Sequence, residues 1–271
     1  HDALPISLVE EMIGMEWMAK AVAQCDQLLE ERPDLLPQVE NLIRQGIQGT
    51  DHTYLLRDYL GDLFFQQGRY SDLLQLYREM AEDSIDGGKV MIEGCARILS
   101  RVPDHIETRM ELALTYREVG DWEGVLNALG PLIENGNSLK AADRALWVEA
   151  AYHHGDVDDA MRVGVPLAEE LADEPRFMLM LIEIMNDLGE FECAHDMLLK
   201  AKEANPDDKR ITRIEAMVVG AHKKHRLSLL ERKHGEGLRT GSEHFEKAEL
   251  HSDLGQIQAA IVHFQRAADD Q

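Results

Sequence analysis

The chain has 271 residues, of which 51 are acidic and 28 are basic, so its formal net charge is −23. A surface this acidic repels nucleic acid and anionic lipid, which disfavours both as partners. No apolar run is long enough to cross a bilayer and no secretory signal is present, so the sequence predicts no membrane segment. The three cysteines lie far apart without a CxxC pair, which predicts reduced thiols and a cytoplasmic location.

The first part of the chain, residues 1–105, predicts divergent helix pairs. In the second helix of the first pair, an apolar stripe recurs at helical spacing and contains Trp17, Ala21, Cys25 and Leu28. The segment 54–80 carries a stronger pattern of its own, but it is out of phase with repeats counted back from Pro103. We interpret it as straddling two of three pairs, which lie near 2–35, 36–69 and 70–105.

The middle of the chain, residues 106–208, is regular. Turn glycines recur at Gly120, Gly155 and Gly189, which are 35 and 34 residues apart. This period is typical of repeat architectures. The stretch 175–206 gives the fullest pattern, two amphipathic helices around Gly189, and the residues that form it are Met178, Leu181, Ile182, Met185, Phe191, Ala194, Leu198, Ala201 and Pro206.

The end of the chain predicts one degenerate basic repeat over 209–240 and a final pair over 241–271. Within the degenerate repeat, Lys223-Lys224-His225 stand where the turn glycine is expected, and a glycine-rich loop is predicted over 234–242. The final pair has its turn at Gly255. We therefore expect residues 1–271 to form a single array without one central core.

These repeats resemble the tetratricopeptide repeat (TPR) family. The resemblance implies an all-α fold, a right-handed superhelical solenoid of about eight antiparallel helix pairs. It also implies protein–protein interaction, as a scaffold or adaptor, because the first helix of each pair in this family lines a concave groove that binds a partner.

The resemblance places an apolar, methionine-rich and acidic set of residues in that groove. It predicts that a basic or amphipathic segment of another protein binds there. The alternative is that the apolar members are core and the glutamates a solvated face. The predicted groove residues are Glu107, Met110, Glu111, Leu114, Leu146, Glu149, Leu179, Met180, Glu183, Ile214 and Met217.

A second candidate surface is a local excess of basic residues. Residues 209–239 hold nine Lys or Arg and three acids, although the rest of the chain is strongly acidic. This asymmetry predicts an acidic partner or self-association with another copy of the chain. The alternative is a solvated repeat with local ion pairs. Nucleic acid is disfavoured because no aromatic residue is interleaved for stacking. The basic interaction patch comprises Lys209, Arg210, Arg213, Lys223, Lys224 and Arg226.

No pattern in the chain predicts catalysis, a cofactor or a metal site. The sequence lacks the GxSxG nucleophile elbow, the phosphate-binding loop and the HExxH zinc motif. Two alternatives to the scaffold stay open. One is a regulatory arm of a larger enzyme, which the absence of an initiator methionine and of a capping helix favours. The other is a self-assembling structural protein.

Overall fold

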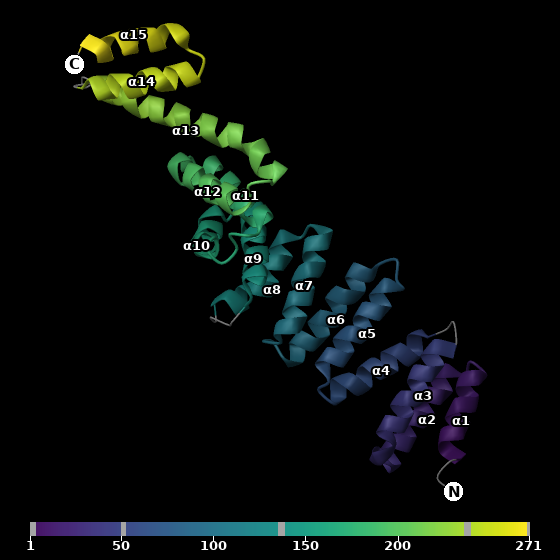
Figure 1. The fold of residues 1–271 in the computed structure, drawn as a ribbon. Coiled ribbons are helices and arrows are strands. Elements are labelled where there is room, and N and C mark those ends of the chain that lie inside the picture. The colour runs from purple at the N-terminus through teal and green to yellow at the C-terminus, as the bar shows by residue number, and fades with distance from the viewer. Residues whose placement is uncertain (1–3, 50–52, 135–138, 236–239, 270–271) are drawn as a thin grey trace. The chain divides into compact units, whose positions relative to one another are not determined.

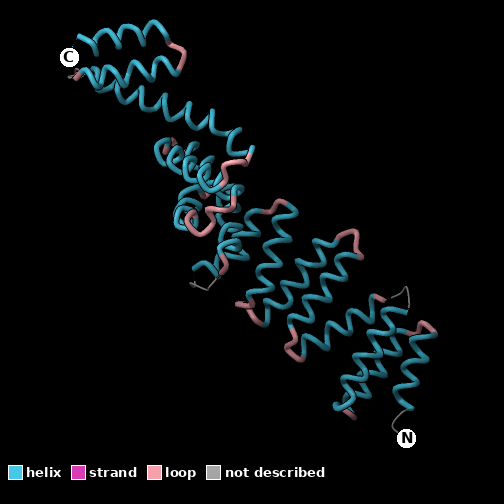
Figure 2. The backbone as a smooth tube through the Cα atoms, viewed as in Figure 1, coloured by secondary structure: helices cyan, strands magenta, loops and turns pink. Residues whose placement is uncertain are grey.

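A computed structural model describes residues 4–49, 53–134, 139–235 and 240–269. Within these ranges the chain forms helices joined by short connections, and no strand occurs there (Figure 2). The chain divides into two compact units, His1–Asn135 (unit 1) and Gly136–Gln271 (unit 2). None of the described helices combines the length and apolar character that a membrane crossing requires.

Unit 1 is built from helices that pack on their sequence neighbours. From α3 to α8 each helix contacts the next, and Figure 1 shows α5 to α8 side by side. Leu73, Ile98 and Leu129 are completely buried between them. The elements are α1 (Leu4–Gly14), α2 (Met18–Glu31), the 3-10 turn η1 (Pro33–Leu35), α3 (Leu36–Gly49), α4 (Tyr54–Gln66), α5 (Tyr70–Glu82), α6 (Gly87–Arg101), α7 (Ile106–Val119) and α8 (Trp122–Glu134).

Unit 2 contains three helix pairs and one long helix. The pairs are α9 with α10, α11 with α12, and α14 with α15, while α13 contacts α11, α12 and α14 (Figure 1). The elements are α9 (Ala141–His154), α10 (Val157–Leu167), α11 (Pro175–Asp187), α12 (Phe191–Ala204), α13 (Lys209–Gly235), α14 (Gly241–Asp253) and α15 (Ile257–Asp269).

Five helix-to-helix turns share one device, a glycine with positive φ. At Gly120, for example, φ is 76° and the backbone N–H donates to the carbonyls of Tyr116 and Arg117. A residue with a Cβ is strained in this conformation, so glycine lets one helix end and the next begin within two residues. Consecutive antiparallel pairs with this turn confirm the all-helical, TPR-like fold that the resemblance implies. The five turns lie at Gly68, Gly120, Gly155, Gly189 and Gly255.

The turn at Gly68 bears on how the first helices pair. It joins α4 to α5, as the turn at Gly120 joins α7 to α8. However, α4 also packs against α3, and α5 packs against both α6 and α7. The helices of residues 1–105 thus form as expected, and their division into the pairs 2–35, 36–69 and 70–105 stays a prediction.

The turn predicted at Lys223–His225 is wrong, because α13 runs without interruption through these residues. Between Gly220 and Gly235 the sequence contains neither glycine nor proline, so nothing there favours a helix break. Buried Ile211, Val218, Leu227 and Leu230 hold the helix along its length. The degenerate repeat is therefore a single helix. The glycine-rich loop expected over 234–242 falls partly outside the described residues, and α13 ends and α14 begins at its two sides.

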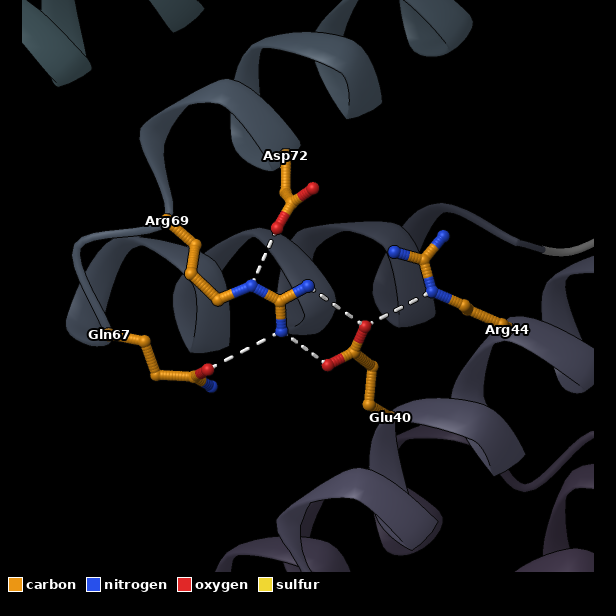
Figure 3. A network of polar contacts seen from close by, with 5 residues as sticks. All are labelled: Glu40, Arg44, Gln67, Arg69 and Asp72. Carbon is orange, nitrogen blue, oxygen red and sulfur yellow. Dashed lines mark hydrogen bonds and ion pairs between the residues drawn. The ribbon is translucent and has the colours of Figure 1, made fainter.

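A network of polar contacts ties three consecutive helices of unit 1 together (Figure 3). The guanidinium of Arg69 donates to Glu40 on α3 at 2.6 Å and to Asp72 on α5 at 2.6 Å, and Arg44 also contacts Glu40. Arg69 lies over the Phe64 ring of α4 at 4.6 Å. The hydrogen bond to Glu40 raises the pKa of Arg69, so its charge is kept. Each of these polar side chains has a partner within the network, which marks the network as structural.

Candidate interaction surfaces

The predicted groove residues of unit 1 all lie on α7, and their carboxylates are engaged within the unit. Glu111 accepts from Arg78 Nη2 at 2.7 Å, and Glu107 accepts from Ser71 Oγ at 2.8 Å. Both partners belong to α5, so the two carboxylates bridge α5 and α7. Met110 is half-buried, whereas Leu114 is 41% exposed. Leu114 is therefore the apolar member of this set that a partner could cover.

The remaining predicted groove residues lie in unit 2, and one of them is a correction. Leu146 is only 7% exposed, because α9 is packed by both α10 and α11, so its side chain belongs to the core. Met217 on α13 is 49% exposed and Glu183 on α11 is exposed. The other four members are partly buried: Glu149, Leu179, Met180 and Ile214.

Met217 borders a hollow of about 550 Å³ between α12 and α13. Phe191 and His225 form another part of its wall, with ring centroids 5.1 Å apart. His225 Nε2 also lies 3.4 Å from Glu192 Oε1. Lys224 completes the lining on the α13 side. The hollow thus joins one residue of the predicted groove to one residue of the predicted basic patch.

Half of the predicted basic patch is neutralised inside unit 2. Lys223 Nζ lies 2.8 Å from Asp253 of α14, and Arg226 pairs with Glu246 of the same helix. Arg210 Nη2 lies 2.6 Å from Asp208 just before α13, and its hydrogen bond lowers the pKa of Asp208 to about 2. The pairs of Lys223 and Arg226 link α13 to α14, so the local charge excess is partly structural. The other three residues, Lys209, Arg213 and Lys224, are exposed.

A larger hollow lies in unit 1, where the sequence patterns predicted no site. It measures about 1060 Å³ and is walled by the α1–α2 turn, α3, the start of α4, the end of α5, and α6. Trp17, Tyr54 and Leu55 line it, and all three are exposed. Trp17 was predicted to belong to the core stripe of its helix, and this is wrong: it precedes α2 and is 48% exposed.

A sequence signal for this hollow exists in retrospect. Trp17 and Tyr54 stand at the N-terminal boundaries of α2 and α4, and each follows a polar turn residue. A side chain at the start of a helix lies over the preceding turn instead of over the core. A prediction from apolar spacing alone assigns such an aromatic residue to the core, because the residue fits the helical spacing of the apolar stripe.

The described residues offer no cluster of three or more His, Cys, Asp or Glu arranged to hold a metal ion. Cys25 and Cys95 are buried, and burial raises the pKa of each thiol to about 12. A thiol with so high a pKa is a poor nucleophile at neutral pH. Exposed Cys193 is the third cysteine.

No protein-family model and no curated protein sequence matches the chain. Among solved structures, "Crystal structure of MamA" is similar with a TM-score of 0.39 and 13% identity, covering 78% of this chain and 94% of that one. "Structure of Naa15/Naa10 bound to HypK-THB" gives a TM-score of 0.44 and 11% identity, covering 99% of this chain and 50% of that one.

Proposed function

We propose that the chain is a non-catalytic protein-interaction scaffold that binds a basic or amphipathic segment of a partner protein in the cytoplasm. One observation carries the proposal: the hollow of unit 1 keeps Trp17, Tyr54 and Leu55 exposed on an acidic molecule. Exposed apolar side chains gathered at one place are typical of interaction sites. Leu114 and Met217 are proposed as further contacts from the predicted groove.

Affinity capture with the whole chain as bait tests this function. The captured proteins are quantified by mass spectrometry for the wild type and for four single variants, Trp17→Glu, Leu55→Glu, Leu114→Glu and Met217→Glu. We expect at least one protein to be captured strongly by the wild type and to be lost from one or more variants whose helical circular dichroism is unchanged. A set of captured proteins that none of the four variants alters would contradict the scaffold function.

A second candidate function, self-association, is favoured by a separate observation. Lys209, Arg213 and Lys224 are exposed on α13, while unit 1 holds 25 acidic and 11 basic residues. Opposite charges on two copies of the chain attract each other most at low ionic strength.

Replacing these three residues by glutamate tests self-association, with Lys223 kept because it pairs with Asp253. We expect sedimentation velocity at low salt to show oligomers for the wild type and monomers for the triple variant. The same distribution for both proteins would exclude this surface.

A further inference from the structure

The hollow of unit 1 presents an apolar surface with aromatic residues at its edges. Tyr54 is 70% exposed and Leu55 is 47% exposed at the start of α4, and Trp17 faces the same space from the α1–α2 turn. Val90 of α6 adds a half-buried aliphatic group. Tryptophan and tyrosine supply large contact areas at low cost in conformational entropy, and they are enriched among residues that dominate binding energy.

The backbone fixes Trp17 before any partner arrives. The N–H of Trp17 donates to the carbonyl of Met12 at 2.8 Å, and its carbonyl accepts from the N–H groups of Lys20 and Ala21. Glu16, directly before it, has a φ of 59°, the only positive φ outside glycine among the residues that the structure describes. The chain thus takes a strained turn that places a half-exposed indole at the edge of the hollow. A fixed aromatic anchor loses little entropy on binding.

The hollow itself is lined by two acids, Glu16 and Asp83, and two bases, Lys20 and Arg57, so what favours a cationic partner is the charge of the unit around it. Arg57 is already neutralised, because its Nη2 lies 2.6 Å from Asp83 Oδ2, and Asp83 itself remains 62% exposed. Glu16 is exposed on the α1–α2 turn, which also lines the hollow. Lys20 Nζ lies 4.3 Å from the centroid of the Trp17 ring, so a cation of the chain itself already covers one face of the ring. Unit 1 as a whole carries a net formal charge of −14.

We propose that the hollow between the α1–α2 turn and the start of α4 is the docking site for a basic amphipathic segment of a partner protein. The apolar side chains of that segment contact Trp17, Tyr54 and Leu55, and its lysines or arginines lie beside Glu16 and Asp83. The proposal rests on the scaffold function and assigns it to a site outside the predicted groove. An anionic partner is disfavoured, because it would approach a unit with more than twice as many acids as bases.

A synthetic probe tests the site on the whole chain. The probe is a fluorescein-labelled amphipathic peptide of leucine and lysine, about 18 residues long so that it forms five helical turns. Binding is followed by fluorescence anisotropy at physiological ionic strength, where non-specific attraction is screened. We expect Leu55→Ala and Trp17→Ala each to weaken binding by about tenfold.

The matched control is Leu8→Ala, because Leu8 is a leucine of the same unit that is 42% exposed on α1 and does not line the hollow. We expect this variant to bind the probe with nearly unchanged affinity. A second peptide, with glutamate in place of lysine, should not bind. Circular dichroism of the three variants checks that each remains folded.

Several results would overturn the assignment. These are absence of probe binding, equal loss of affinity in Leu55→Ala and Leu8→Ala, or equal binding of the glutamate peptide. Binding of anionic lipid vesicles that Leu55→Ala abolishes would assign the hollow to a membrane surface instead. Failure here is distinguishable from failure of the scaffold function, which the capture experiment judges through Leu114→Glu and Met217→Glu as well.

Discussion

The hollow of unit 1 and helix α13 of unit 2 differ in what their side chains already contact. On α13 the conspicuous basic residues Lys223 and Arg226 pair with acids of α14. At the hollow, the conspicuous residues are apolar and stay exposed, whereas Arg57 is neutralised by Asp83. In unit 2, the local excess of basic residues is therefore partly structural. In unit 1, apolar residues of the kind that usually form a core are exposed and form a surface.

The largest expected effect compares one substitution in the two units. Leu146→Ala should lower the free energy of unfolding by about 3 kcal/mol, because it leaves a cavity at a buried position of unit 2. Leu55→Ala at the hollow should cost less than about 0.5 kcal/mol, because this leucine is half exposed. Urea unfolding followed by circular dichroism measures both. Similar losses would mean that Leu55 is core and that the hollow is closed.

Acid should destabilise the last helix pair of unit 2. Burial, with the charges of Lys247, His244, His251 and Arg266, lowers the pKa of His263 from 6.5 to about 4. Between these values the unfolded chain takes up a proton that the folded pair resists. The contribution of neutral His263 to the free energy of unfolding is therefore fully present above pH 6.5, and the free energy falls by about 2 kcal/mol as the pH drops to 4.

Thermal unfolding between pH 7 and pH 4 measures this loss. His263→Gln should reduce the loss of thermal stability between pH 7 and pH 4. His154→Gln, at an exposed position of α9, should leave that loss unchanged. An equal loss of stability in His263→Gln and in the wild type would assign the acid destabilisation to other groups.

A glycine exchange at the hollow tests whether its turn is strained. Glu16→Gly should raise the free energy of unfolding by about 1 kcal/mol, because φ is 59° at this residue. Glu11→Gly, inside α1, should lower it by about 1 kcal/mol, because glycine is a poor helix former. Differential scanning calorimetry gives both shifts. A loss of stability in both variants would show that the turn is unstrained.

The smallest expected effect separates two neighbouring lysines of α13. Lys223→Ala should cost about 0.5 kcal/mol, because it breaks the pair with Asp253 at a partly exposed position. Lys224→Ala should have no measurable effect, because its side chain is exposed. The urea midpoints of the two variants show whether the pair of Lys223 with Asp253 contributes to stability. Equal midpoints would mean that the pair with Asp253 contributes nothing and that the basic residues of α13 are equivalent.

Local sequence signals account for the helices and for most of their ends. Apolar residues at helical period fixed the buried faces, and glycines such as Gly120, Gly155 and Gly189 fixed the turns, because these signals act over a few residues. The resemblance to the TPR family predicted which residues would line a groove. Among these residues Leu114 and Met217 are exposed, whereas Leu146 is buried, and partner binding in the groove stays a prediction.

Tertiary structure decided the rest. Whether Trp17 and Leu146 are buried depends on which helices pack over them. The apolar helical period looks the same in the sequence whether such a residue ends up buried or exposed. Which side chains of α13 become buried depends on its contacts with α11, α12 and α14. The hollow of unit 1 needs five segments brought together from distant parts of the sequence. Local patterns cannot specify such contacts, because burial and charge neutralisation arise between residues that are remote in the chain.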